Sequence, residues 1–213
     1  MPKIFVISGG PGVGKTSVVN ELEKKGFNVL KEAARELSQS DKRFKEKSIL
    51  EINKKDFQDA ILGFQIKQIK ELEKNERENN RKNKKINRNS ENDDKLGMGS
   101  RNDGKLKQEV AFSDRGLGDT FVYYVLASYK IPKDKFEYAK KFRYEKIFIL
   151  DFLDFYEKDD LRKETIKEAE KIHDDIIKMY EKIGYDSNII TVPFMSVEKR
   201  ADFILNKISL EEG

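Results

Sequence analysis

A glycine-rich stretch that ends in a lysine and a threonine carries the clearest chemical signal in the sequence. Its spacing, G-x-x-x-x-G-K-T, begins at Gly9 and ends with Lys15 and Thr16. Phosphate oxygens need several converging N–H donors, and only a backbone almost free of side chains can wrap closely enough to supply them. We therefore expect a loop that holds the phosphates of a nucleotide, formed by Gly9, Gly10, Pro11, Gly12, Val13, Gly14, Lys15, Thr16 and Ser17.

The segments on either side of this loop predict the strand and the helix that the motif requires. Residues 4–7 form an unbroken apolar run, which is typical of a strand buried on both faces of a parallel sheet. The residues after the loop repeat apolar side chains at helical spacing until Gly26, a common helix stop. A helix N-terminus favours negative charge, so the start of this helix adds to the binding of phosphate. We expect Lys15 to reach the β- and γ-phosphates and Thr16 to ligate Mg²⁺. The expected cofactors are ATP and Mg²⁺.

A second candidate site follows the apolar run 109–113, where Asp114 and Arg115 come directly after a predicted strand. Ligands of parallel α/β sheets bind beyond the carboxyl ends of the strands, so both side chains are expected near the bound nucleotide. We expect Asp114 to join Thr16 in holding Mg²⁺, directly or through water, and Arg115 to clamp phosphate oxygens. The alternative for Asp114 is an ordinary turn or helix-cap aspartate.

Glu32 ends another predicted strand, 27–31, and Arg35 follows it on the next predicted helix. The carboxylate could deprotonate an attacking hydroxyl group, while Arg35 could bind a negative charge on the phosphoryl acceptor. The same two residues also suit a helix-initiating acid and its i,i+3 ion pair. The sequence leaves both interpretations open.

Gln65 is a polar residue within an apolar helical stripe that runs from residue 57 to residue 69. Its side-chain amide offers both a donor and an acceptor, which suits the edge of a flat heterocycle in the acceptor site. The alternative is an exposed helix glutamine that binds no ligand.

Arg162 stands at the start of a long predicted helix, 163–183. It follows a segment rich in carboxylates and aromatic residues. A mobile lid carrying Arg162 would close over the phosphates and exclude water. Asp159 or Asp160 acting as a helix cap explains the same pattern locally. The candidate catalytic residues are thus Lys15, Glu32, Asp114, Arg115 and Arg162, and the candidate acceptor-binding residues are Glu32, Arg35, Gln65 and Arg115.

Two features near the C-terminus carry weaker chemical signals. The only histidine of the chain, His173, lies in a charged helical pattern without an evident partner, so we expect it on the surface. The segment 193–200 follows the last predicted strand, where such a loop commonly borders the base of a bound nucleotide.

Apolar runs alternate with helical patterns along the chain, which predicts a doubly wound α/β fold of five parallel strands flanked by helices. The predicted strands are 3–8, 27–31, 109–113, 145–150 and 188–192. The predicted helices are 15–25, 33–40, 55–75, 117–129, 134–142, 163–183 and 196–208. We expect a single domain over residues 1–213, because a chain of this length can bury a substantial core.

Residues 75–108 differ from the rest of the chain, with eight asparagines and almost no apolar side chains. Ten Lys and Arg residues against six Asp and Glu residues give this segment a charge of +4, which equals the net charge of the whole protein. We expect an exposed, largely flexible, low-complexity insertion. A functionless solvated segment is the simplest interpretation, and the alternative is binding of anionic lipid or nucleic acid through residues 81–88.

The composition excludes several classes of site and location. The chain has no cysteine, so thiol catalysis and cysteine-based zinc sites are excluded. No apolar stretch approaches the ~18 residues of a membrane span, and the N-terminal run is too short for a secretory signal. These features predict a cytoplasmic protein.

The order of the motifs GGPGVGKT, EAARE, GFQ and DRGLGDT, followed by FY…LR and GY…VP…SVEKR, resembles that of a known family. This is the AAA-type P-loop ATPase family that includes the ribosylnicotinamide kinase domain of NadR and the animal TRPL translocation defect protein. The resemblance covers nearly the whole chain outside residues 75–108, and EAARE and DRGLGDT are its most specific parts. It implies a P-loop NTPase fold similar to thymidylate and deoxynucleoside kinases, with strand order 2-3-1-4-5.

The resemblance also implies positions for the site residues. Glu32 and Arg35 would lie at the acceptor site, with Gln65 near them. Asp114 would lie at Mg²⁺, and Arg162 would belong to the lid. Two features depart from the ribosylnicotinamide kinases, namely the arginine directly after Asp114 and the long basic segment.

Two functions are compatible with these residues. The first is a Mg²⁺-dependent kinase that transfers the γ-phosphoryl group of ATP to a nucleoside- or nucleotide-like small molecule. The second is a switch or adaptor, in which binding of ATP or GTP orders a loop that a protein or an anionic-lipid partner recognises. No NKxD-like guanine-binding motif lies at the end of a predicted strand, which favours ATP over GTP.

Overall fold

The computed structural model describes residues 3–45, 54–89, 110–152 and 165–209. Five parallel strands form one sheet in the order β2-β3-β1-β4-β5, as the family resemblance implied. The strands are β1 Lys3–Ser8, β2 Asn28–Leu30, β3 Val110–Asp114, β4 Lys146–Leu150 and β5 Ile189–Val192. The predicted fold class is confirmed.

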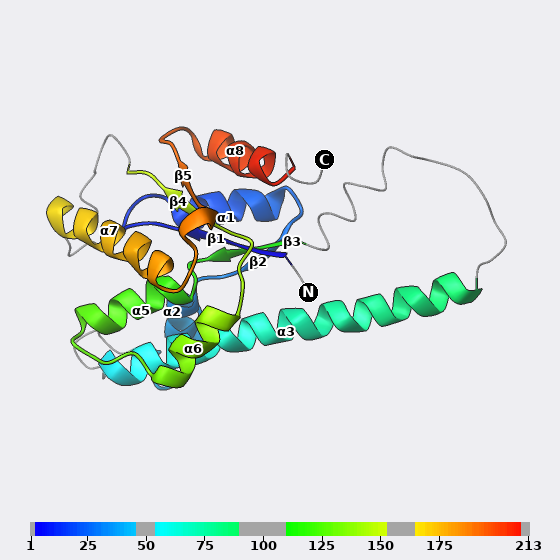
Figure 1. The fold of residues 1–213 in the computed structure, drawn as a ribbon, viewed down its shortest axis with the longest axis horizontal. Coiled ribbons are helices and arrows are strands. Elements are labelled where there is room, and N and C mark those ends of the chain that lie inside the picture. Colours follow the sequence, from blue (N-terminus) through cyan, green and yellow to red (C-terminus); the bar gives the residue numbers. More distant parts are fainter. Residues whose placement is uncertain (1–2, 46–53, 90–109, 153–164, 210–213) are drawn as a thin grey trace.

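Helices cover both faces of the sheet (Figure 1). They are α1 Lys15–Lys24, α2 Ala33–Ser40, α3 Lys54–Asn89, α5 Leu117–Leu126, α6 Lys133–Lys141, α7 Ile166–Lys182 and α8 Val197–Ser209. Helices α1 and α8 pack side by side on one face, while α5 packs between α3 and α7 on the other. A 3₁₀ turn, Asp186–Asn188, leads into β5.

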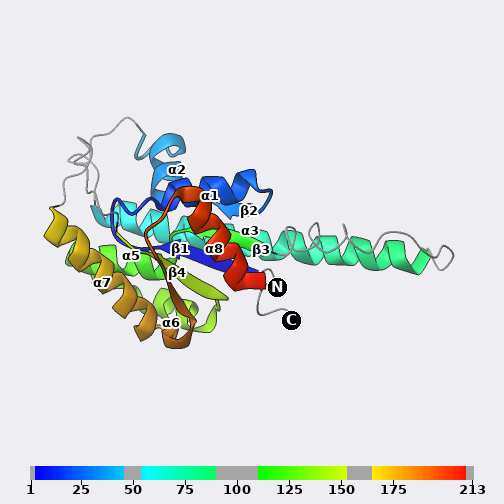
Figure 2. The ribbon, with the colours of Figure 1, turned by 90° about the horizontal axis from the view of Figure 1, so that it is seen from above.

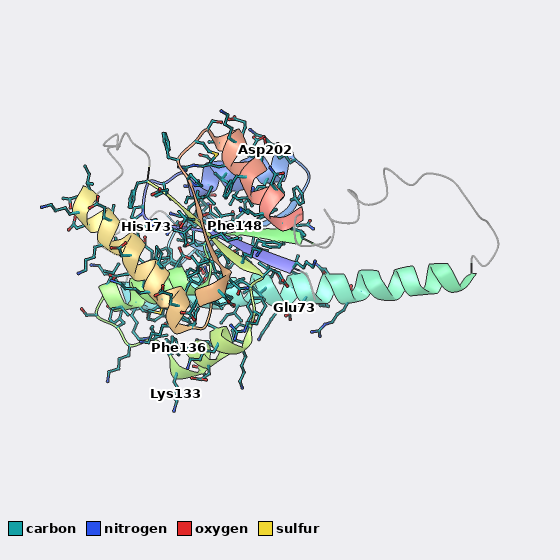
Figure 3. The ribbon with its side chains drawn as sticks, turned by 45° about the horizontal axis from the view of Figure 1, so that its top comes forward. Glu73, Lys133, Phe136, Phe148, His173 and Asp202 are labelled. Carbon is teal, nitrogen blue, oxygen red and sulfur yellow. The ribbon has the colours of Figure 1, made fainter. Side chains whose placement is uncertain are left out.

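The alternating side chains of β1 explain why two helical layers form. Ile4 and Val6 are buried in the core on the side of α3, α5 and α7. Phe5 and Ile7 are buried in the second core, on the side of α1 and α8, together with Phe148 of β4 (Figure 3). The unbroken apolar run therefore supplies both cores, as expected for a strand buried on both faces.

The register of the sheet places the ends of β1 and β3 at the same level. Ile7 pairs with Asp114, the last residue of β3, and on its other side with Phe148. The residues that follow β1 and β3 therefore meet at one edge of the sheet. This is the edge at which parallel α/β folds bind their ligands.

Helix α3 is longer than the sequence predicted. We expected it to end near residue 75, followed by a flexible segment, but it continues to Asn89 and projects away from the sheet (Figures 1 and 2). A lack of apolar residues prevents a packed core, but it does not prevent a solvated helix. Two ion pairs at i,i+4 spacing span residue 75 and favour the continuation, and they are Glu73–Arg77 and Lys74–Glu78.

The remainder of the basic segment, residues 90–108, lies outside the described residues. Its character as an insertion, and the binding of anionic lipid or nucleic acid through residues 81–88, stay predictions. Within the described ranges, no helix combines the length and the apolar character needed to cross a membrane.

A buried aspartate on α5 connects the ends of two strands to the helices. Asp119 accepts a hydrogen bond from Ser8 Oγ at 2.7 Å and another from the Gly116 N–H at 3.0 Å. The Tyr180 hydroxyl donates a third at 2.6 Å. These donors belong to β1, to the turn after β3 and to α7, so one carboxylate fixes the relative positions of three parts of the fold.

We predict that Asp119→Ala lowers the free energy of unfolding by about 3 kcal/mol, because three buried donors lose their acceptor. Urea unfolding followed by circular dichroism measures this change. Glu71→Ala is the matched control, because the Glu71 side chain is 60% exposed and its ion pair with Lys67 lies on the surface. A loss for Asp119→Ala no larger than that of the control would contradict the role assigned to Asp119.

Candidate functional site

The loop between β1 and α1 has the backbone that its glycines predict. Gly9, Gly12 and Gly14 have positive φ values of 127°, 81° and 87°, which residues with side chains rarely adopt. A Cβ atom on Gly9 would also lie 2.8 Å from the Leu150 carbonyl oxygen. The chain therefore passes close to the end of β4 before α1 begins.

Lys15 folds back over the β1–α1 loop. Its ammonium group donates to the Gly9 carbonyl oxygen at 2.9 Å and to the Gly10 carbonyl oxygen at 2.6 Å. Burial, followed by the charge of Arg115, lowers the pKa of Lys15 to about 7. An ammonium group has three donors, so the two carbonyl oxygens leave one donor for a further acceptor.

Thr16 and Asp114 meet between α1 and β3. The Thr16 hydroxyl donates to Asp114 Oδ2 at 2.7 Å. Asp114 is buried, and its Oδ1 has no hydrogen-bond partner among the described residues. Burial raises the pKa of this carboxyl group, although the bond from Thr16 acts in the opposite direction.

The oxygen atoms of Thr16 and Asp114 fit the chemistry of Mg²⁺. This ion prefers oxygen ligands and is commonly held by one or two protein groups together with phosphates and water. A buried carboxylate oxygen without a partner is a favourable ligand for such a cation. Across the described ranges, no group of three or more His, Cys, Asp or Glu side chains could hold a metal.

Arg115 pairs with Glu32 at the end of β3. Its Nε donates to Glu32 Oε1 at 2.8 Å, and its guanidinium carbon lies 5.6 Å from the centre of the Tyr123 ring. Burial raises the pKa of Glu32, but the charge and the hydrogen bond of Arg115 outweigh it and lower the pKa overall. Arg115 has a φ of 71°, an unusual backbone conformation for a residue with a side chain, and its N–H donates to the Ile7 carbonyl oxygen at 3.0 Å.

Arg35 lies at the rim of this pair. Its side chain is 58% exposed, and its Nε is 4.0 Å from Glu32 Oε2. This is the i,i+3 ion pair that the sequence offered as one of two interpretations. Binding of an acceptor by Arg35 stays a prediction.

A cavity of about 380 Å³ opens beside the Glu32–Arg115 pair. Its wall combines these charges with a buried amide and with aromatic and aliphatic side chains, including Phe57, Ile61, Gln65 and Tyr123. The cavity lies between α2, α3 and α5, next to the turn after β3. Its size and mixed lining suit a small organic molecule with polar groups.

Gln65 is buried in the wall of this cavity. The Thr120 hydroxyl donates to Gln65 Oε1 at 2.7 Å, and Gln65 Nε2 donates to the Gly116 carbonyl oxygen at 3.3 Å. The interpretation as an exposed glutamine is therefore wrong. The protein fixes the orientation of the amide and leaves it one N–H and one lone pair.

Arg162 was the remaining candidate, as part of a lid over the phosphates. It falls within residues 153–164, outside the described part of the chain, so the lid stays a prediction. The other candidates, apart from exposed Arg35 at the rim, come together at the carboxyl edge of the sheet.

His173 is not the surface residue that its charged surroundings predicted. It lies on α7 (Figure 3), is 9% exposed, and accepts a hydrogen bond at Nδ1 from the Gly10 N–H at 3.1 Å. The Phe152 ring packs against it, with the ring centres 4.8 Å apart. The Gly9–Gly10 peptide is therefore held on both sides, because Lys15 binds its carbonyl oxygen and His173 binds its N–H.

Arg200 is a second residue at this loop that the sequence analysis missed. It lies on α8, is buried, and donates from Nη1 to the Val13 carbonyl oxygen at 2.6 Å. In the sequence it ends a Glu-Lys-Arg run, which is typical of an exposed helical turn. No local pattern distinguishes it from a surface cation.

The sequence profile of the AAA domain family matches residues 4–79 and 80–200, which is most of the chain. The chain belongs to this family. The match includes the β1–α1 loop and Arg200 alike. Among curated proteins, there is no significant match to the chain.

Two solved structures are similar to this AAA domain protein. One is a crystal structure of NadR protein in complex with NR, with 17% sequence identity and a TM-score of 0.57. The other is NadR protein in complex with NAD and AMP-PNP, with 15% identity and a TM-score of 0.55. The matches cover 95% of this chain but 50% and 48% of the NadR chains, so it spans about half their length. At such low identity the likeness shows the fold alone, that of a P-loop NTPase.

We predict that the bond between His173 and Gly10 makes the stability of the fold depend on pH. Burial lowers the pKa of His173 from 6.5, and the charge of Lys15 acts in the same direction. Asp174 and Asp151 oppose this shift without cancelling it. Because the unfolded chain then binds the proton more readily, the free energy of unfolding falls as the pH drops below about 6.5.

Urea unfolding of the wild type and of His173→Asn between pH ~7.5 and ~5.5 measures this dependence. Asparagine keeps an acceptor for the Gly10 N–H but does not titrate. The wild type should therefore lose more stability than the variant on acidification. Parallel curves for the two proteins would contradict the assignment.

Proposed function

We propose that this AAA domain protein binds ATP with Mg²⁺ and transfers the γ-phosphoryl group to a nucleoside- or nucleotide-like small molecule. The observation that best supports this is the cavity of about 380 Å³ at the carboxyl edge of the sheet, with the Glu32–Arg115 pair in its wall. A protein that only binds and hydrolyses a nucleotide needs no second pocket there. A carboxylate and a guanidinium group in its wall suit a polar phosphoryl acceptor.

The β1–α1 loop would hold the triphosphate of ATP. Its glycines keep side chains away from the backbone N–H groups, of which that of Gly10 is bonded to His173, and the N-terminus of α1 adds a favourable dipole. A phosphate oxygen would accept from the remaining donor of Lys15 and raise the pKa of that residue again from about 7. Catalysis of phosphoryl transfer depends mainly on such positioning and charge stabilisation.

Thr16 and Asp114 would hold the magnesium ion through the hydroxyl oxygen and Oδ1. When bound, Mg²⁺ neutralises phosphate charge and orients the nucleotide. Both residues belong to regular elements, one at the start of α1 and one at the end of β3, so their separation is fixed by the fold.

Glu32 would act on the phosphoryl acceptor. A hydroxyl oxygen of the acceptor forms a bond to the γ-phosphorus, the bond from that phosphorus to the ADP oxygen breaks, and the hydroxyl proton passes to Glu32. Since Arg115 occupies Oε1, Oε2 is the carboxylate oxygen available for this proton. Gln65 and the Tyr123 ring would contact the rest of the acceptor.

The two NadR complexes support this choice of ligands. NadR binds NR in one structure and NAD with AMP-PNP in the other. That a protein of similar fold over half its length binds NR and a nucleotide analogue is in keeping with the pair of ligands that we propose for this protein.

A nucleotide-dependent switch or adaptor is the second candidate function. The observation that favours it is the projection of α3 beyond the sheet, which offers a helical surface to a protein or anionic-lipid partner (Figures 1 and 2). In that case ATP or GTP would be bound without a phosphoryl acceptor.

A panel of acceptors distinguishes the two functions. The protein is mixed with Mg·ATP and, in turn, with nucleosides, nucleoside monophosphates and nicotinamide riboside, and the release of ADP is measured. We expect at least one compound to raise the rate by ~10²-fold or more over acceptor-free hydrolysis, because positioning of both reactants provides most of the rate enhancement. The same slow turnover with every compound would contradict the kinase.

We predict that Glu32→Gln lowers kcat with the acceptor by about 10²- to 10³-fold, because the amide still accepts from Arg115 but cannot take a proton. The affinity for ATP should change by less than about twofold, because Glu32 lies outside the β1–α1 loop. Glu36→Gln, one turn further along α2, is the matched control and should behave as the wild type. A wild-type kcat for Glu32→Gln would exclude Glu32 as the base.

A further inference from the structure

Arg200 comes from the C-terminal helix and is buried against the β1–α1 loop. It is 2% exposed, although arginine is rarely this deeply buried unless it is paired. Its Nη1 donates to the Val13 carbonyl oxygen at 2.6 Å, and its Nη2 donates to the Asp151 carbonyl oxygen at 3.2 Å. The guanidinium carbon lies 5.4 Å from the centre of the Phe194 ring. Arg200 thus binds two backbone carbonyl groups of the site.

The bond to the Val13 carbonyl determines which way the next N–H points. No described peptide bond is cis, so the Gly14 N–H points away from the Val13 carbonyl oxygen and therefore away from Arg200. Gly14 is the N-cap of α1, and its N–H makes no hydrogen bond within the described part of the chain. This N–H is therefore one of the donors that the helix N-terminus offers to an anion.

Glycine by itself does not determine this orientation. Gly14 has a φ of 87°, but a glycine adopts either sign of φ readily, so the peptide between Val13 and Gly14 can rotate. After rotation, a carbonyl oxygen would replace the N–H and repel phosphate oxygens. A permanently charged guanidinium group that holds the Val13 carbonyl opposes this rotation.

We propose that Arg200 is a positioning residue for phosphate binding, which keeps the Gly14 N–H available to a phosphate oxygen. It acts through the Val13–Gly14 peptide and does not touch the ligand. The ligand class is the phosphate chain of a nucleotide, so this inference rests on the proposed function.

The second bond of Arg200 connects this role to the other end of the loop. Asp151 directly follows β4, and its neighbour Phe152 packs on His173, which accepts from the Gly10 N–H. Arg200 and His173 therefore support the loop from two helices. Arg200 holds the Val13 carbonyl oxygen near the end of the loop, and His173 holds the Gly10 N–H near the start of the loop.

Three variants test the proposal. Arg200→Met removes both hydrogen bonds and the charge, whereas Arg200→Lys keeps the charge but not the two-donor geometry. Lys199→Met is the matched control, because Lys199 is an exposed cation one position earlier on α8. Isothermal titration calorimetry gives the affinity for Mg·ATP, and ¹H–¹⁵N NMR follows the Gly14 amide signal before and after Mg·ATP is added.

We expect Arg200→Met to lose about 10- to 100-fold in affinity, Arg200→Lys to lose less, and Lys199→Met to lose nothing. In the wild type, the Gly14 amide signal should shift when Mg·ATP binds, and this shift should be lost in Arg200→Met. A purely structural role for Arg200 would lower the unfolding temperature and leave both readouts unchanged in the folded variant.

Wild-type affinity and a wild-type Gly14 shift in folded Arg200→Met would overturn the inference. If thermal unfolding shows that Arg200→Met does not fold, Arg200→Lys becomes the test, and the same two results in that variant would overturn it. Failure of the wild-type protein itself to bind Mg·ATP would instead overturn the proposed function.

Discussion

The orientation of the peptide groups in the β1–α1 loop is the constraint on which the site depends. A loop with few side chains binds an anion only if its N–H groups converge, and a glycine-rich backbone does not hold one orientation by itself. Here three side chains supply the constraint. Lys15 and His173 hold the Gly9–Gly10 peptide from opposite sides, and Arg200 holds the Val13 carbonyl. The sheet contributes to this constraint because it brings α7 and α8 against the loop that follows β1, its central strand.

Local patterns in the sequence were sufficient to predict the elements of the fold and part of the site. The apolar run before Gly9 and the spacing behind it specify a strand, a loop and a helix without reference to the rest of the chain. Asp114 and Glu32 were placed at the edge of the sheet because each directly follows an apolar run. The strand order, by contrast, was implied by the family resemblance, because the residue pattern within a strand does not indicate which other strands it pairs with.

Contacts between distant residues could not be predicted from the sequence. His173 and Gly10 are 163 positions apart, and Arg200 and Val13 are 187 positions apart. His173 and Arg200 both stand in charged helical turns, whose composition indicates exposure. They are buried because each contacts the backbone of the β1–α1 loop, which is distant in the sequence. The length of α3 was misjudged for a different reason, since apolar content governs packing whereas charge spacing is enough to favour a helix.

The unbroken course of α3 connects the cavity wall to a remote part of the structure. The same helix carries Gln65 in the cavity wall and ends at Asn89. At roughly 1.5 Å per residue, these two positions are about 36 Å apart along the helix axis. One continuous helix therefore contributes to the wall of the cavity and also extends to a point far from the sheet (Figure 1).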